Sequence, residues 1–267
     1  MTRAREEFLQ RQRELSLLGQ IAEFFDWDQQ TGMPPAAAAG RAEQAALIGE
    51  WRHRRATDPA WEDIFAALEQ DLDGLDPAQL REAKKEYGRA RRVPVDWETE
   101  FTRVVTRAHT AWEQAREANS FAQFEPHLRR IVELRRAYAG FFSEAVHPYD
   151  ALLADYEPDL TTAQVAGVFT PLRRAQVELL REILARQKPA KPFAAPFPRE
   201  AQWELARRAM AWVGLDPDRS RLDRSVHPFT VTLGYDDVRI TTAIDETTPT
   251  SLFSTLHESG HALYESN

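Results

Sequence analysis

Cysteine is absent from the 267 residues of the chain. Disulfides are therefore excluded, and a reducing cytoplasm is the compartment that we expect. Long hydrophobic runs are also missing, since no stretch approaches the roughly 18 apolar residues of a membrane-spanning helix. The first ten residues, MTRAREEFLQ, contain no apolar run of the kind found in secretory signals. We expect neither a membrane span nor export.

A basic block is missing as well. The formal net charge is −8 and is spread along the chain, which argues weakly against nucleic acid as a partner. Glycine is scarce, with 11 residues among long stretches rich in Ala, Glu, Arg and Leu, and this composition favours helix. The length suits one large domain or two small ones with an ample core.

Apolar periodicity predicts a mainly α chain. We expect helices over residues 3–25, 36–54, 59–71, 77–91, 94–119, 121–145, 161–187 and 199–213. Asp-Pro pairs should open the third and fourth of these with Asp as the N-cap, and the Thr161-x-x-Gln164 capping box should open the seventh. Residues 26–35 read as a polar loop, and Pro171 should kink or divide its helix.

The pattern changes after residue 223. Residues 229–233 and 238–242 are β-branched and alternating, with Gly-Tyr-Asp-Asp between them, which predicts a β-hairpin. A lone hairpin is only marginally stable in water, so it must pack on the helices. It could cap the helical core, or it could pair with an extended substrate through backbone hydrogen bonds.

Residues 252–264, LFSTLHESGHALY, carry a His-Glu-x-x-His pattern. On a helix, His257 and His261 lie on one face about one turn apart, so both imidazoles can reach a single Zn²⁺. Glu258 lies beside that position, where it can take a proton from a water on the metal, as in zinc peptidases. The alternative is two surface histidines on an amphipathic helix. Thr250 or Ser251 should cap this helix, and Leu252, Phe253, Leu256, Leu263 and Tyr264 should form its apolar face.

A catalytic zinc normally takes three protein ligands. Glu265 is four residues past His261 but lies roughly 12 Å along the helix axis from His257, so a straight helix cannot bring it to the metal. The nearby sequence therefore predicts two ligands and leaves the third unassigned.

The hairpin and the His-Glu-x-x-His helix together resemble the carboxypeptidase Taq family of metallocarboxypeptidases. The residues that carry the resemblance are His227-Pro-Phe229, Asp237-x-Arg239-x-Thr241, His257-Glu-Ser-Gly-His-Ala-Leu-Tyr264, Trp27-Asp-x-x-Thr-x-Met-Pro34 and Tyr156-Glu-Pro-Asp-Leu-Thr-Thr162. A His-Glu-x-x-His pattern alone is shared by many peptidases, whereas three motifs in this order are far more specific.

The resemblance implies a zinc-dependent enzyme that removes single residues from peptide C-termini, a helical shell around a deep groove, and a homodimer. It implies His257 and His261 as metal ligands and Glu258 as the general base. Family members are much longer, so we expect residues 1–267 to form one incomplete domain. It would contain a helical region to residue 187, a Pro-rich linker over 188–198 and the zinc-binding part over 199–267. The third ligand, a Glu in a His-Glu-Ser/Gly-Gln motif, would lie outside this chain.

Three further residues are candidates for substrate binding. Arg239 could bind a substrate carboxylate, with Asp237 beside it, or the two could simply pair on one strand face. His227 could line the groove or donate to an oxyanion, and it could equally be an ordinary loop histidine. Asp26 and Asp28 could suggest a metal pair, although a capped helix end is the better interpretation.

Three hypotheses follow for the whole chain. The first is a zinc carboxypeptidase, for which the sequence does not distinguish Zn²⁺ from Co²⁺ and whose activity in this chain depends on a third ligand that the chain itself does not reveal. The second is a zinc oligopeptidase, against which the Asp-x-Arg-x-Thr hairpin argues. The third is a non-catalytic helical fragment or interaction protein that holds metal weakly.

Overall fold

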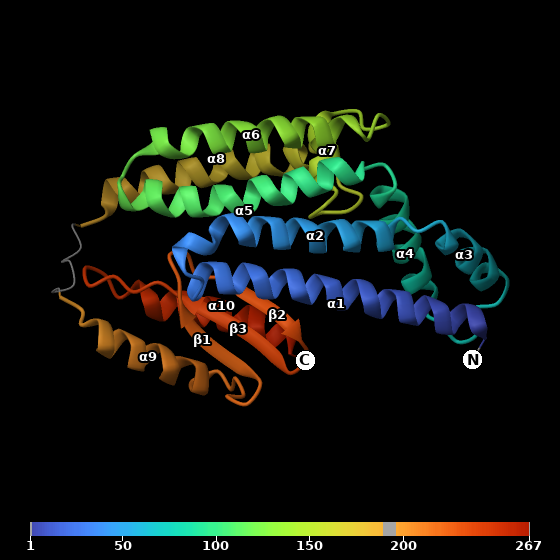
Figure 1. Cartoon of the computed structure of the whole chain (residues 1–267). Coiled ribbons are helices and arrows are strands. Elements are labelled where there is room, and N and C mark those ends of the chain that lie inside the picture. Colours follow the sequence, from blue (N-terminus) through green and yellow to red (C-terminus); the bar gives the residue numbers. More distant parts are fainter. Residues whose placement is uncertain (1, 189–195, 267) are drawn as a thin grey trace. The chain divides into compact units, whose positions relative to one another are not determined.

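The computed structural model describes residues 2–188 and 196–266 and divides into two compact units, residues 1–128 with 195–267 and residues 129–194. The helices within the described residues are α1 (Arg3–Thr31), α2 (Ala38–Ala56), α3 (Ala60–Gln70), α4 (Pro77–Ala90), α5 (Val95–Glu117), α6 (Phe121–Gly140), α7 (Pro148–Leu153), α8 (Thr162–Arg186), α9 (Arg199–Trp212) and α10 (Thr250–Glu265), with a 3₁₀ turn η1 (Pro35–Ala37) (Figure 1). The strands are β1 (Ser220–Arg224), β2 (Thr230–Gly234) and β3 (Asp237–Thr242). A mainly α fold with a small sheet beside the His-Glu-x-x-His helix is confirmed.

Two of the predicted helix starts are confirmed at the level of the cap. Asp76 accepts a hydrogen bond from the N–H of Ala78 at the start of α4, and Thr161 forms a capping box with Gln164 at the start of α8. The start of α3 differs by one residue, because Pro59 rather than Asp58 is the N-cap. The Asp58 carboxylate still accepts a hydrogen bond from the N–H of Ala60, so it satisfies a backbone donor of the first turn from one position before the N-cap.

The polar loop predicted over residues 26–35 is wrong for its first six residues, since α1 continues to Thr31. Side-chain bonds within the last turns support the helix: Gln30 donates to Asp26 at 2.7 Å, and the Thr31 hydroxyl donates to the carbonyl of Trp27 at 2.6 Å. Trp27 is buried, so this otherwise polar segment has one large apolar side chain that packs in the interior. Gly32 then ends the helix.

The second unit differs from the prediction in two places. The helix expected over 121–145 ends at Gly140, and His147 caps the short helix α7 with a capping box that includes Asp150. Helix α8 runs unbroken through Pro171, so that proline marks no boundary, and α8 contains no buried residue. Most of the predicted Pro-rich linker lies outside the described residues. The extent of the predicted domain stays a prediction.

The largest hydrophobic cluster joins α1, α3 and α4. Its buried members are Phe8, Trp61, Ile64, Phe65, Leu68, Leu75, Leu80, Ala83 and Tyr87. Trp61 stacks on Phe65 with ring centroids 5.3 Å apart, and Phe8 meets the edge of Trp61 at 5.9 Å. Helix α2 lies along α1 and also packs on α5, which extends the helical layer (Figure 1).

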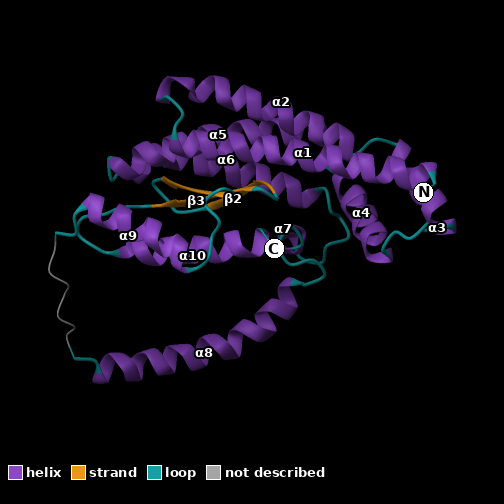
Figure 2. Ribbon diagram, turned by 90° about the horizontal axis from the view of Figure 1, so that it is seen from below, coloured by secondary structure: helices purple, strands orange, loops and turns teal. Residues whose placement is uncertain are grey.

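The sheet has three strands in the order β1-β3-β2, so the predicted hairpin is confirmed and a parallel strand is added to it. Strand β1 has the sequence SRLDR, which lacks the β-branched residues that indicate a strand. Its pairing with β3 is the interaction that makes it extended. Figure 2 shows the sheet nearly edge-on, with α1 on one side and α9 and α10 on the other.

Of the apolar face predicted for α10, Leu263 packs against the core cluster, but the most buried residues of the helix are others. Its buried residues are Ser251, Thr255, Glu258, Ser259 and Ala262, whereas Phe253 is 68% exposed and Tyr264 is 83% exposed. Small side chains let the helix approach the sheet closely. The Ser251 hydroxyl donates to Gln202 of α9 at 2.7 Å, and the Ser251 carbonyl accepts from the hydroxyl of Thr242 on β3 at 3.1 Å. No side chain caps the helix, and Pro249 is its N-cap.

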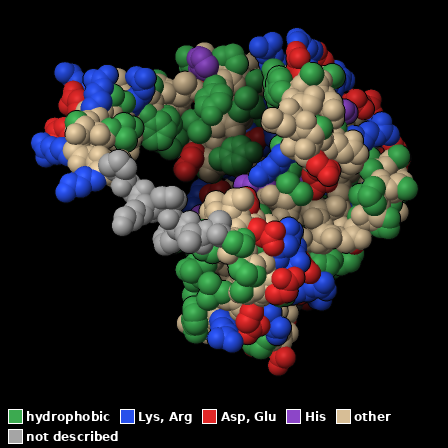
Figure 3. Space-filling model, turned by 90° about the vertical axis from the view of Figure 1, so that its left-hand side faces the viewer, with side chains coloured by type: hydrophobic (Ala, Val, Ile, Leu, Met, Phe, Trp, Pro, Cys, Tyr) green, Lys and Arg blue, Asp and Glu red, His purple; other side chains and the backbone are tan. Residues whose placement is uncertain are grey.

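Among the described residues no helix is both long and apolar enough to cross a membrane. On most of the face drawn in Figure 3, lysine and arginine side chains lie among aspartate and glutamate side chains. This mixture agrees with the dispersed charge of the sequence.

We predict that Leu68→Ala lowers the free energy of unfolding by about 2–5 kcal/mol, because Leu68 is fully buried in the α1–α3–α4 cluster and its removal leaves a cavity. Chemical denaturation measures the change. Leu17→Ala is the control, since Leu17 is 46% exposed and should change stability by less than about 0.5 kcal/mol. Equal effects of the two substitutions would contradict the position of the core.

Candidate metal and catalytic site

Helix α10 brings the two predicted metal ligands together. The Nε2 atoms of His257 and His261 are 3.3 Å apart, their rings are nearly perpendicular at 84°, and both side chains are exposed. Two nitrogens bound to one Zn²⁺ at about 2.05 Å with a tetrahedral angle lie about 3.3 Å apart. The histidine pair therefore has the spacing of two ligands on one metal ion.

A third ligand is not found near this pair. Within residues 2–188 and 196–266, no three His, Asp or Glu side chains are grouped so that they could hold a metal ion. The described residues thus fit two of the three protein ligands that a catalytic zinc takes.

Glu258 lies between the two histidines in sequence but points toward the interior. Its side chain is only 7% exposed, and its Oε2 accepts a 2.7 Å hydrogen bond from the hydroxyl of Thr230 on β2. The same hydroxyl is 3.1 Å from the backbone carbonyl of Glu258. Two exposed imidazoles next to a buried, hydrogen-bonded carboxylate form an arrangement that can bind a metal and accept a proton beside it.

Alternation along β3 separates the Asp-x-Arg-x-Thr motif into two faces. Val238 and Ile240 point into a core with Leu215 and Ala262, on the α10 side of the sheet. Arg239 points to the opposite side, where its guanidinium lies over the rings of Trp27 at 4.2 Å and Phe24 at 5.5 Å. The motif therefore joins the sheet to α1.

Asp237 and Arg239 form the intra-strand pair that the sequence suggests. Arg239 donates from Nε and from one terminal nitrogen to the two carboxylate oxygens of Asp237, at 2.8 and 2.7 Å. The hydrogen bonds to Asp237 raise the pKa of the Arg239 guanidinium. A role of either residue in binding substrate stays a prediction, since the donors of Arg239 that face Asp237 are already engaged.

A second arginine completes the contact with Trp27. Arg221 on β1 is the strand partner of Arg239, and its guanidinium lies 4.9 Å from the Trp27 ring. It is itself paired bidentately with Asp223 at 2.8 and 2.9 Å. Stacking of guanidinium groups on an indole is favourable, so Trp27 holds β1 and β3 against α1.

His227 lies in the loop between β1 and β2, where its side chain is exposed. The loop is fixed by Thr241, the last residue of the motif: its hydroxyl accepts from the N–H of Phe229 at 2.9 Å and lies 2.7 Å from the Ser225 hydroxyl. Ser225 is thereby held between Thr241 and the carbonyl of His227, to which it lies at 2.6 Å. The sheet thus sets the position of the His-Pro-Phe segment.

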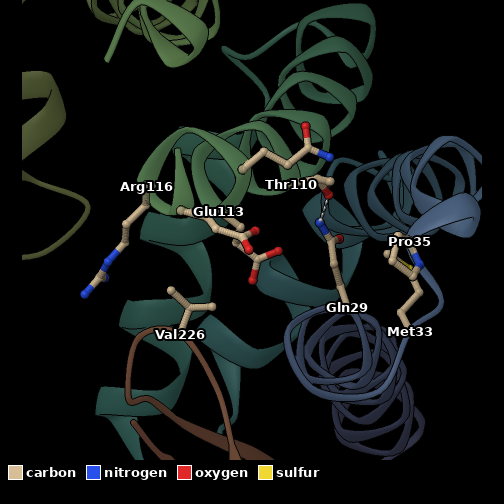
Figure 4. A pocket seen from close by; sticks show the side chains of 9 residues that line it. Gln29, Met33, Pro35, Thr110, Glu113, Arg116 and Val226 are labelled. Carbon is tan, nitrogen blue, oxygen red and sulfur yellow. Dashed lines mark hydrogen bonds between the residues drawn. The ribbon is translucent and has the colours of Figure 1, made fainter. Parts of the chain in front are cut away.

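A pocket of about 660 Å³ lies next to this loop. Its lining comes from the ends of α1 and α5 and from the loop: Gln29, Met33, Pro35, Thr110, Glu113, Gln114, Arg116, Glu117 and Val226. Figure 4 shows Glu113 directed into the pocket and Val226, the neighbour of His227, on its wall. The lining combines amide, hydroxyl, carboxylate and guanidinium groups with the apolar side chains of Met33, Pro35 and Val226.

Asp26 and Asp28 do not form a metal pair. The Asp28 carboxylate forms an ion pair with Arg41 at 2.6 Å, whereas Asp26 accepts from Gln30. The capped-end interpretation is also corrected, because both residues lie within α1. Their roles are structural contacts of the helix.

Two residues of this region were not predicted from the sequence. Thr230 follows the His-Pro-Phe motif directly, and Arg221 lies on a strand that has no sequence signature. A signal for Thr230 did exist: in the hairpin it pairs with Ile240, and residues paired across strands share a face. Arg221 offers no such signal, because its partner is set by a parallel pairing.

Comparison with known proteins gives consistent matches. The family model described as carboxypeptidase Taq (M32) metallopeptidase matches residues 7–267. Carboxypeptidase 1 of Bacillus subtilis (strain 168) is 33% identical over an alignment of 267 positions that covers 98% of this chain and 53% of that protein. Thermostable carboxypeptidase 1 of Thermus thermophilus is also 33% identical, covering 98% of this chain and 55% of that protein. The chain thus spans about half the length of the curated relatives it matches.

Solved structures agree with these matches. A crystal structure titled BsuCP superposes with a TM-score of 0.94 at 31% identity, covering 100% of this chain and 55% of that chain. The M32 carboxypeptidase from Deinococcus radiodurans R1 gives a TM-score of 0.83 at 35% identity, covering 99% of this chain and 54% of that chain.

We predict that Arg239→Lys lowers the free energy of unfolding by about 1 kcal/mol, because lysine keeps the charge but loses the bidentate bond to Asp237 and the planar stack on Trp27. Thermal or chemical denaturation measures the loss. Arg208→Lys is the control, since Arg208 pairs with Glu204 on an exposed helix face. An unchanged stability of Arg239→Lys would argue against the contact with α1.

We also predict that His257→Ala weakens Zn²⁺ or Co²⁺ binding by at least about 10-fold, because one of two nitrogens 3.3 Å apart is lost. Calorimetry, or the visible spectrum of bound Co²⁺, measures affinity. His127→Ala on α6 controls for nonspecific binding by imidazole. Equal affinities of the two variants would exclude the histidine pair as the metal site.

Proposed function

The chain belongs to the carboxypeptidase Taq (M32) family of metallopeptidases, and we propose that it carries the histidine pair and general base of a zinc-dependent carboxypeptidase. In this proposal the reaction releases single amino acids from the C-termini of peptides. The observation that carries it is the pair of Nε2 atoms 3.3 Å apart beside the buried carboxylate of Glu258.

The role of each residue follows from its position. A divalent ion, when bound, supplies Lewis acidity toward the scissile carbonyl and acidifies water. His257 and His261 would hold the ion through neutral imidazole nitrogens. Glu258 takes the proton from the attacking water as the new C–O bond forms. It then passes the proton to the amine nitrogen as the C–N bond breaks.

The identity of the metal is part of the proposal. Imidazole nitrogen suits both Zn²⁺ and Co²⁺, and we propose Zn²⁺ because its tetrahedral geometry matches the spacing of the nitrogens. The third protein ligand is expected in a segment other than those described. Without it the metal should bind more weakly.

We further propose peptides as the substrate class, a homodimer as the assembly and the cytoplasm as the compartment. Support for the first two is the family resemblance, and support for the third is the absence of cysteine from the sequence. A role for Asp237, Arg239 and His227 in substrate binding belongs to the same proposal.

The test is chelator-sensitive release of the C-terminal amino acid from an N-blocked peptide, with Zn²⁺ added to the purified chain. We predict that Glu258→Gln retains the metal and lowers turnover by more than about 100-fold, because the amide cannot accept the proton. Glu265→Gln, two helical turns further along α10, should leave turnover unchanged. A Glu258→Gln variant with near-normal turnover would rule out the general-base role.

A folded wild-type chain that binds metal and releases no amino acid would contradict the proposed activity for this chain. That result would favour the non-catalytic alternative, in which these residues form a helical scaffold with two metal ligands.

A further inference from the structure

The carboxylate of Glu258 is held by one neighbour. Thr230 is the residue that hydrogen-bonds this side chain within the described part of the chain, with its Oγ1 2.7 Å from Oε2. Oε1 has no hydrogen-bond partner among the described residues. It is also not a fully buried atom. One oxygen is therefore fixed, and the other keeps some solvent access within a largely buried side chain.

The single proton of the Thr230 hydroxyl has two acceptors to choose from. The backbone carbonyl of Glu258 is at 3.1 Å and already accepts within α10, whereas Oε2 is at 2.7 Å and belongs to an ionisable group. Hydrogen bonds to a charged acceptor are shorter and stronger than those to a neutral one. The proton therefore goes to the carboxylate.

The position of Thr230 is determined by the sheet rather than by the loop before it. Thr230 is the register partner of Ile240, and the preceding residue, Phe229, exchanges hydrogen bonds with Thr241. Ile240 is fully buried on the side of the sheet that faces α10, so Thr230 must point to the same side. A β-branched residue in a strand also has few side-chain rotamers, which keeps the hydroxyl in place.

We propose that Thr230 is a positioning residue that orients the Glu258 carboxylate, so that Oε1 faces the water of the reaction. This inference rests on the proposed function, since it assigns a task to the base of that reaction. Thr230 itself touches neither substrate nor metal in this role. Misplacing a reacting group by about 1 Å can cost about 100-fold in rate, so one hydrogen bond that fixes the carboxylate affects kcat strongly.

The central test is Thr230→Val, which keeps the branched shape and removes the hydroxyl. We predict that kcat falls about 10- to 100-fold while KM and metal content stay within about threefold of wild type. Thr230→Ser restores the hydroxyl and should recover most of the loss. Thr232→Val is the matched control, since Thr232 is on the same strand and face and is half-buried like Thr230; it should leave kcat unchanged.

A double variant tests whether Thr230 acts through Glu258. In a Glu258→Gln background, Thr230→Val should lower the residual rate no further, because the group that it positions is already disabled. Independent losses that multiply would overturn the proposal, and so would a Thr230→Val enzyme with wild-type kcat.

A readout without turnover separates this inference from the proposed function. The ¹³Cδ NMR signal of Glu258, identified by its absence in Glu258→Gln, should shift in Thr230→Val and stay near its wild-type position in Thr230→Ser and Thr232→Val. An unmoved signal would overturn the contact whatever the activity. A shifted signal in a chain without turnover would contradict the proposed function. The hydrogen bond from Thr230 to Glu258 would then have a structural role only. Circular dichroism confirms that each variant is folded.

Discussion

The two-residue period of β3 is the constraint on which the site depends. Residues that alternate along a strand point to opposite faces, so the five residues from Asp237 to Thr241 serve two layers at once. Val238 and Ile240 form a core with α9 and α10, while Arg239 stacks on Trp27 of α1. A slip of one residue would place the arginine in the apolar core and the isoleucine against the indole, so the register is strongly specified.

The same constraint couples distant parts of the chain to the carboxylate. A three-stranded sheet of short strands is weak alone, and here both faces are covered by helices. Trp27 is held by two arginines that are strand partners, each neutralised by an aspartate two residues away. The charges are therefore paired within the sheet, and α1 supports β3 without leaving an uncompensated cation near Trp27. Because β2 pairs with β3 in a defined register, the support of β3 also fixes the position of Thr230 on β2.

Much of this arrangement is readable from the sequence, because its signals are local. The spacing of His257 and His261 predicts nitrogens on one face of a helix, and alternation predicts the hairpin. Features that depend on distant partners are not readable. Strand β1 is extended because it pairs with β3, and residues 26–31 remain helical because Trp27 is buried. Most of the buried face of α10 was predicted wrongly because hydrophobicity ranks Phe253 and Tyr264 above the serines and threonines that the sheet contacts. Among the described residues no third His, Asp or Glu is grouped with the histidine pair.

The two faces of the sheet carry different side chains, and this difference affects the chemistry proposed for Glu258. A guanidinium paired bidentately with a carboxylate favours the charged form and opposes proton uptake, which is the step that a general base must perform. Arg239 lies on the α1 face, where Asp237 occupies it, and the residue that reaches the carboxylate from the α10 face is a neutral threonine. A hydroxyl fixes one oxygen with a single bond and leaves the other free to accept a proton. Strand alternation therefore keeps the guanidinium of Arg239 away from Glu258, the proposed base, and places the hydroxyl of Thr230 beside it.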